Sequence, residues 1–378
     1  MKTTTRNVFG GLALTAALVS GCGDEEFAAF LGRQLNFLLV PNTASTNVDI
    51  RLLEQGSGIP GPGVQVGTGN HPTMVAITPN GALAYVPNAD EVGTISYFNI
   101  NPDNSNFAQS PTSPAPVDFP PCTVNIHPGG RFLYAVGDND ITGFGIGDSG
   151  FLTPLGDTTF EFGGKGTVGI TPGAFFRDGQ FFFHNAGDLG VAEFQVNSDT
   201  GALNQLEGIG IDGRVTSITR LPNSEILLVA RRDFGQEPAR AELLQGHSSG
   251  VLESYRVEAN GATTFIDAEP FEADPMGVVA STRGFAYVGT ISPGSGVLAF
   301  QVDANGNISN EVAFAAGGQD SSYPGVDPSG NFVFVSAQST NQVFGFRIDE
   351  GGNMITLNGS PFTGYSAPGV PTLAFYQL

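Results

Sequence analysis

Positive charge is scarce in this chain of 378 residues. Lysine occurs only at Lys2 and Lys165, and 15 Lys and Arg residues stand against 36 Asp and Glu, so the formal net charge is −21. A surface this acidic repels the phosphate backbone of nucleic acids. The sequence therefore argues against a nucleic-acid-binding protein.

Cysteine and long apolar runs are also scarce. The two cysteines are Cys22 and Cys122, and neither has a second ligand at the short spacing of a zinc site. After Cys22, no apolar run approaches the roughly 20 residues that a membrane-spanning helix requires. We therefore expect no metal, no cofactor and no spanning helix.

The first 21 residues carry the features of an export signal. Lys2 and Arg6 precede an apolar stretch, Val8 to Ser20, that has the length of a signal-peptide core and is too short to span a bilayer. Small residues then lead directly into Cys22. We assign residues 1–21 to a signal peptide.

The residues Leu18-Val19-Ser20-Gly21-Cys22 resemble the lipobox of bacterial lipoproteins, in which cleavage precedes a cysteine that is then lipidated. The resemblance implies a membrane anchor at Cys22 and a tether over residues 22–33. Gly23 stands where an aspartate favours retention in the inner membrane, so an outer-membrane location is expected, periplasmic or surface-exposed. The alternative is an ordinary secretory signal followed by a coincidental cysteine.

A strand pattern recurs along the rest of the chain, residues 34–378. One apolar, aromatic-rich segment occurs seven times, with successive copies 45 to 59 residues apart. The copies are Phe37–Val40, Leu83–Val86, Phe132–Ala135, Phe181–His184, Ile226–Val229, Phe285–Val288 and Phe332–Val335. This spacing is typical of the second strand of a four-stranded propeller blade.

Turn residues and the last strand complete the prediction. Glycines such as Gly81, Gly201 and Gly330 end short polar turns, where positive φ is needed. The repeat region begins with a second strand and ends with a first strand, Pro371–Tyr376. Together these predict an all-β, seven-bladed β-propeller whose ring is closed by N- and C-terminal strands in one blade.

The turns with the pattern Thr78-Pro79-Asn80-Gly81, the segment Asp188-Leu189-Gly190 and the segment Asn358–Gly364 resemble the lactonase-like propeller family. That family includes propeller-type 6-phosphogluconolactonases and muconate-lactonizing enzymes. Kelch, WD40 and tryptophan-docking propellers fit less well, because their diagnostic Gly-Gly, Trp-Asp and Trp positions are missing.

The family resemblance implies a site in which a histidine near the start of an inner strand and arginines of neighbouring blades approach the substrate. Residues 163–167, at the corresponding start, contain no histidine. Arg231 and Arg232, after the fifth second-strand copy, match the position of a family arginine. The sequence thus keeps one part of the catalytic arrangement and lacks another.

Arginine is concentrated in the fifth repeat. Its arginines include Arg214, Arg220, Arg231, Arg232 and Arg240. We expect Arg214, at the start of an inner strand, and Arg231 and Arg232, after a second strand, to converge at one end of the central channel. Guanidinium groups there would bind a carboxylate or phosphate. The alternative is a solvated network with Asp233 and Glu237.

Other side chains are candidates at the same end. His71 precedes the second inner strand, His184 ends the fourth second-strand copy and Asp188 follows it. His71 and Asp188 are candidate ligand contacts with the arginines, while His184 is a candidate catalytic group with Arg231 and Arg232. Cys122 is expected to be a small buried residue. The long segment between Arg231 and Gly250 is a candidate lid or partner site.

The sequence favours an envelope-anchored lactonase-like propeller that binds a ligand or protein, either as a scaffold or as a degenerate lactonase. The alternative is an active lactonase, a carboxylic ester hydrolase acting on a sugar or dicarboxylate lactone. The expected partners are the membrane, through Cys22, and a small anion or an envelope protein. We expect a monomer.

Overall fold

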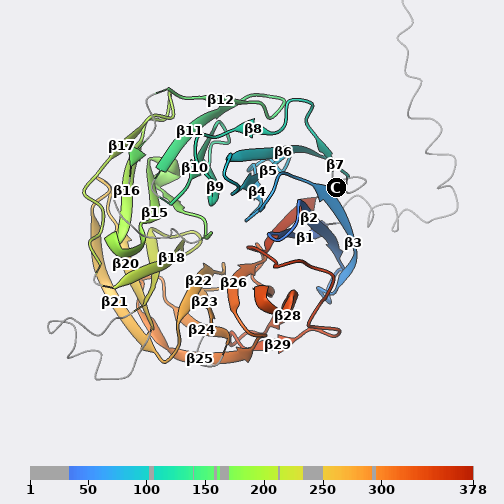
Figure 1. Ribbon diagram of the computed structural model, residues 1–378. Helices are drawn as coiled ribbons and strands as arrows, with labels where there is room; N and C mark the ends of the chain where they lie inside the picture. The colour runs from blue at the N-terminus through green and yellow to red at the C-terminus, as the bar shows by residue number, and fades with distance from the viewer. Residues whose placement is uncertain are drawn as a thin grey trace, which may run out of the picture.

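The computed structural model describes residues 34–101, 106–138, 140–156, 160–161, 170–211, 213–232, 250–291 and 295–377. These residues form seven antiparallel sheets, arranged as blades around a common axis (Figure 1). Besides strands, regular structure in the described ranges is limited to three short 3-10 turns. They are η2 (Arg177–Gly179), η3 (Gly187–Leu189) and η4 (Gln338–Thr340). The prediction of an all-β, seven-bladed propeller is confirmed.

The first three blades, with strands in sheet order, are as follows. Blade 1 contains β3 (Pro60–Gly67), β2 (Asn47–Leu53), β1 (Gln34–Asn42) and β30 (Thr372–Gln377). Blade 2 contains β4 (Ala76–Ile77), β5 (Leu83–Asn88), β6 (Thr94–Asn101) and β7 (Asn106–Gln109), with β8 (Ala115–Pro116) beside β6. Blade 3 contains β9 (Thr123–Ile126), β10 (Phe132–Val136), β11 (Asp140–Ile146) and β12 (Leu152–Pro154), with β13 (Phe160–Glu161) beside β11.

The remaining four blades each have four strands. Blade 4 contains β14 (Ala174–Phe176), β15 (Phe181–Asn185), β16 (Val191–Val196) and β17 (Leu203–Gln205). Blade 5 contains β18 (Arg214–Arg220), β19 (Ile226–Arg232), β20 (Gly250–Val257) and β21 (Thr263–Phe271). Blade 6 contains β22 (Pro275–Ala280), β23 (Phe285–Thr290), β24 (Gly296–Val302) and β25 (Ile308–Ala316). Blade 7 contains β26 (Ser321–Val326), β27 (Phe332–Ala337), β28 (Gln342–Ile348) and β29 (Met354–Thr356).

Blade 1 joins the two ends of the described chain. β30 pairs antiparallel with β1, and Leu38 lies opposite Leu373. In Figure 1 the red C-terminal strand accordingly lies beside the blue N-terminal strands. Because this pairing supplies the missing inner strand, blade 1 has the same strand order as the other blades, and the ring closes as predicted.

Each second strand is buried on both faces, because blades lie on either side of it. In β19, Leu227 and Val229 pack with Phe183 of blade 4, whereas Leu228 packs with Val278 of blade 6. Alternate residues of a strand point to opposite faces of its sheet, so one apolar strand serves two interfaces. The same alternation determines which of the adjacent residues Arg231 and Arg232 is buried.

Turn glycines allow neighbouring blades to approach closely. Gly201, between β16 and β17, has φ 74°, and a Cβ there would lie 2.5 Å from the ring of Phe132 in blade 3. The hydroxyl of Tyr134 donates to the carbonyl of Gly201 at 2.8 Å. Glycine is therefore required by backbone conformation and by space, as the turn pattern predicted.

Buried polar side chains near the axis also join the blades. The amide of Gly173 in blade 4 donates to the Oδ1 of Asn125 in blade 3 at 2.7 Å. The side-chain amide of Asn185 in blade 4 donates to the carbonyl of Thr216 in blade 5 at 3.0 Å. These bonds satisfy polar groups that the sheet ladders leave unpaired, and they hold the inner strands in register around the axis.

Candidate functional site

Two of the predicted arginines lie side by side at one end of blade 5. Arg214 is the first residue of β18, Arg232 is the last residue of β19, and the two are directly opposite in the antiparallel pair. Opposed residues of such a pair project from the same face of the sheet. The structure therefore brings Arg214 and Arg232 together, on the face directed toward blade 6.

The guanidinium of Arg232 has weak partners. Its Nη2 donates to the sulfur of Met276 at 3.0 Å, and its Nε lies 3.9 Å from an oxygen of Asp274. The Nε is buried and makes no hydrogen bond. A thioether is a poor acceptor for a charged donor, so the donors of Arg232 are only partly used.

Arg231 is placed differently. Its Nε donates to Oε1 of Glu253 at 2.9 Å, and the hydroxyl of Tyr255 donates to Oε2 of the same carboxylate at 2.6 Å. Arg231 is 2% exposed and Glu253 is 0% exposed. Because adjacent residues of a strand point to opposite faces, Arg231 enters the interface with blade 4. The structure thus separates Arg231 from the expected group of three arginines.

His184, the catalytic candidate, is fully buried at the end of β15. Its Nδ1 lies 2.9 Å from the carbonyl of Asn185, so Nδ1 carries the proton, and Nε2 accepts from the hydroxyl of Thr123 at 3.1 Å. Burial lowers the pKa of His184 to about 4. The structure therefore places His184 as a neutral link between blades 3 and 4, with both ring nitrogens in use.

The other two predicted contacts lie on exposed loops. Asp188 is in η3, which lies beside β18, and its side chain is exposed. His71 precedes β4 of blade 2, with its Nδ1 4.0 Å from an oxygen of Asp90. Asp188 is therefore near the arginine end of blade 5. His71 belongs to blade 2, which does not adjoin blade 5.

An apolar group lies at the axis, and the sequence analysis did not predict it. Met74, Met276, Tyr323 and Val370, here called the axial cluster, pack in one cluster together with Ile170. These side chains come from the starts of inner strands in different blades, the same position in the repeat as Arg214. That shared position was the signal that could have identified them.

Tyr323 connects the axial cluster with Arg232. Burial, with a smaller contribution from Cys122, raises the pKa of Tyr323 to about 12, against the opposing effect of the Arg232 guanidinium. Tyr323 is therefore a neutral hydroxyl close to the arginine. Cys122 is itself partly buried, and burial together with Asp138 raises its thiol pKa to about 12, so it is not a thiolate.

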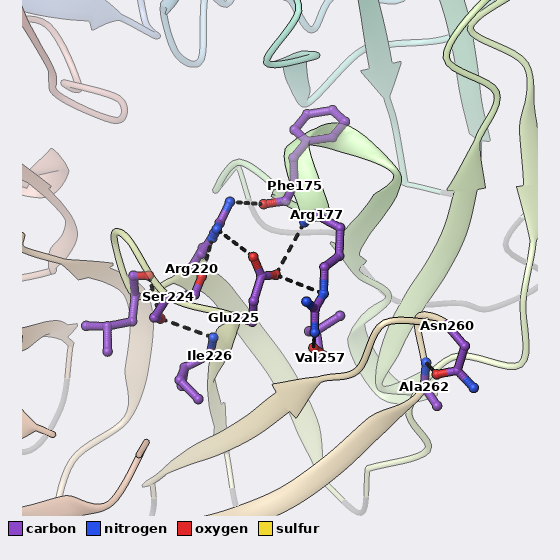
Figure 2. A network of polar contacts seen from close by, with 10 residues as sticks. Phe175, Arg177, Arg220, Ser224, Glu225, Ile226, Val257, Asn260 and Ala262 are labelled. Atoms are coloured by element: carbon purple, nitrogen blue, oxygen red, sulfur yellow. Dashed lines mark hydrogen bonds and ion pairs between the residues drawn. The ribbon is translucent and has the colours of Figure 1, made fainter. Parts of the chain in front are cut away.

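Arg220, a further arginine of the fifth repeat, lies at the opposite end of β18. Figure 2 shows Arg220 and Arg177 on two sides of Glu225. Arg220 donates to Oε1 of Glu225 at 3.0 Å and to the carbonyl of Phe175 at 3.1 Å, and Arg177 donates to the carbonyl of Val257 at 2.8 Å. This network ties blade 4 to blade 5. The arginines of blade 5 thus divide into separate groups.

Some predicted features lie outside the described residues. They are the signal peptide, Cys22 and its tether, residues 163–167, Arg240, and the segment 233–249 with Asp233 and Glu237. Within the described ranges, no group of three or more His, Cys, Asp or Glu residues could hold a metal ion. No helix in those ranges is long and apolar enough to cross a membrane.

Comparisons with known proteins agree with this architecture. The family described as lactonase, 7-bladed beta-propeller, matches residues 45–168. No curated protein sequence matches the chain.

Solved structures of similar fold cover nearly the whole chain. A candidate 6-phosphogluconolactonase from Bacteroides uniformis has a TM-score of 0.75 at 16% identity, covering 91% of this chain and 99% of its own. A similar protein from Bacteroides fragilis has a TM-score of 0.72 at 16% identity, with 91% and 98% covered. The periplasmic gluconolactonase of Pseudomonas aeruginosa has a TM-score of 0.70 at 16% identity, with 90% and 99% covered. The chain is a seven-bladed β-propeller, and residues 45–168 within it match the lactonase family.

Proposed function

We propose that this propeller binds a small anion at the axial end of blade 5, with Arg232 as the principal contact and Arg214 beside it. The observation that carries the proposal is the state of Arg232. Its buried Nε makes no hydrogen bond, its Nη2 contacts a thioether, and among the described residues the closest carboxylate oxygen, that of Asp274, is 3.9 Å away. A carboxylate or phosphate offers the paired oxygen acceptors that a guanidinium fork requires.

Binding without turnover is favoured by the groups around the arginines. Hydrolysis of a lactone requires a group that can take a proton from water or attack the carbonyl. His184 has both nitrogens in hydrogen bonds, and Cys122 is held as a thiol. The family's histidine position falls in residues 163–167, which contain none. A ligand-binding relative of the lactonases fits these features.

The export signal expected at the start of the sequence supports a proposal on location. We propose that the propeller is a monomer attached to the outer membrane by lipid at Cys22, so that its ligand is met in the cell envelope. Its net charge of −21 disfavours contact with anionic lipid headgroups, which makes a lipid anchor rather than the protein surface the membrane contact. An envelope protein is the alternative partner.

Thermal stabilisation by added anions tests the binding site. Gluconate, 6-phosphogluconate and adipate should each be titrated against the wild type. A ligand at 100 times its Kd stabilises the folded state by about 2.7 kcal/mol. Arg232→Gln should remove the stabilisation, and Arg347→Gln, at an exposed arginine of β28, should keep it. A response that is equal in all three proteins would refute the site.

Active lactonase is the second candidate, because the matching family and the solved neighbours carry lactonase names. A pH-stat assay with sugar lactones and muconolactones separates the two functions. Hydrolysis that is lost in Arg232→Gln and kept in Arg347→Gln would replace the binding proposal by an enzymatic one. Binding without hydrolysis supports the scaffold.

A further inference from the structure

The surroundings of Arg232 are mostly apolar. Met276 contacts its guanidinium directly and packs in the same cluster as Tyr323. Tyr323 packs with Met74 and Val370, which come from other blades. Met74 is 4% exposed, and Tyr323 and Val370 are each 7% exposed. Met276 is only partly buried and packs against these side chains, so a ligand that reaches Arg232 meets a thioether backed by aliphatic and aromatic groups.

Few partners for hydroxyl groups are present in the axial cluster. Of its four side chains, only Tyr323 has a strong hydrogen-bonding group, and burial keeps that group as a neutral hydroxyl. Each ligand hydroxyl that is buried without a partner lowers affinity by about tenfold or more. A hydrocarbon surface in the same place gains affinity from burial. The surroundings thus select against a polyol.

We propose that the ligand is an anion with an apolar body, a carboxylate on an aliphatic or aromatic frame, rather than a sugar acid or sugar phosphate. Its carboxylate lies at Arg232 and its hydrocarbon part against Met276, the partly exposed member of the axial cluster. The inference rests on the proposed anion site and adds the chemical class of its ligand. Arg232 supplies charge recognition, whereas Met276 and Tyr323 supply selectivity.

Asp274 adds a second consequence. Its carboxylate lies 3.9 Å from the Nε of Arg232, on the residue just before β22. A bound carboxylate shares the guanidinium with Asp274 and is repelled by it. Replacing Asp274 by Asn keeps the shape and removes the competing charge. Affinity for a carboxylate ligand therefore rises in Asp274→Asn and falls in Arg232→Gln.

Hexanoate and gluconate are a matched pair for the test, because they have the same carbon chain and carboxylate and differ only in the hydroxyl groups of gluconate. Calorimetric titration of the full-length protein should give a Kd for hexanoate at least about tenfold lower than for gluconate. Hexanamide, which lacks the charge, should bind more weakly than hexanoate. Asp274→Asn should tighten hexanoate binding, and Met276→Gln should weaken it while Met276→Leu retains it.

The outcomes separate the two proposals. Gluconate binding as tightly as hexanoate, and lost in Arg232→Gln, overturns the apolar-body assignment and leaves the anion site intact. Saturable binding of neither acid overturns both. The comparison of the two acids uses the wild type, so it decides the inference even when a substitution at the axis impairs folding.

Discussion

The buried pair of Arg231 and Glu253 gives the sharpest test of the packing between blades 4 and 5. Arg231 donates to one carboxylate oxygen at 2.9 Å and Tyr255 donates to the other at 2.6 Å. Removing one partner leaves a charge in the interface without its counter-ion. Breaking such a pair costs about 3–5 kcal/mol of unfolding free energy. We expect a loss of this size for Arg231→Met and for Glu253→Leu.

The double substitution should behave differently. With both charges removed, the Tyr255 hydroxyl loses the Glu253 carboxylate as an acceptor, which costs about 1–3 kcal/mol. Arg231→Met/Glu253→Leu should therefore be more stable than either single variant, since a buried ion pair replaced by apolar groups is often neutral. The sign of this difference follows from burial and does not depend on the exact energies.

Urea denaturation followed by circular dichroism measures the three unfolding free energies, and Arg347→Met is the exposed control, expected within about 0.5 kcal/mol of wild type. The midpoint of thermal unfolding should fall by about 2 °C per kcal/mol for a domain of this size. Two results would refute the reasoning. One is a loss below about 1 kcal/mol in both single variants, and the other is a double variant whose loss equals their sum.

Further predictions concern titration, backbone strain and the anchor. Burial raises the pKa of Glu193 to about 7, so its contribution to folding is complete below about pH 4.5 and is lost as pH rises through 7. In Glu193→Gln, the unfolding free energy should depend less on pH. Urea denaturation at pH 8.5 should show this variant to be about 1–3 kcal/mol more stable than the wild type. An unchanged stability at that pH would contradict the prediction. Burial lowers the pKa of His184 to about 4, so stability should fall as pH drops from about 6.5 toward 4, and its ring signals in NMR should not titrate between pH 6 and 8. Asp178 has φ 55° in η2, a left-handed conformation that glycine adopts with less strain. Asp178→Gly should therefore preserve or raise the thermal midpoint, with a gain in unfolding free energy of up to about 1 kcal/mol. A lower midpoint would show that the side chain of Asp178 stabilises the turn. Labelling with an alkyne fatty acid should mark the wild type and not Cys22→Ser; equal labelling of both would exclude lipidation there.

Much of the fold was predictable because its determinants are local. Turn glycines such as Gly81 and Gly330 have positive φ as expected, and the second-strand copies coincide with buried strands. The pairing of β1 with β30 followed from complementary partial repeats at the two ends of the propeller region. Repetition makes such a prediction robust, since each blade restates the same pattern of strand and turn.

The site was less predictable, because β19 is buried on both faces. The segment Ile226–Arg232 is apolar up to its arginines, so its pattern does not show which of Arg231 and Arg232 points to which neighbour. The register with β18 and β20 decides this, by placing Arg232 opposite Arg214 and Arg231 near Glu253. One residue of slip would exchange the two roles.

The sequence by itself determined the blade number, the turn positions and the closure of the ring, because short-range periodicity and turn chemistry encode them. Only the tertiary structure decided that Met74 and Tyr323 meet at the axis and that His184 joins Thr123 of another blade. These partners are distant in the chain, and they meet because ring closure brings the inner strands of all blades to one axis. The chemistry at that axis is therefore a property of the closed ring, which no single repeat contains.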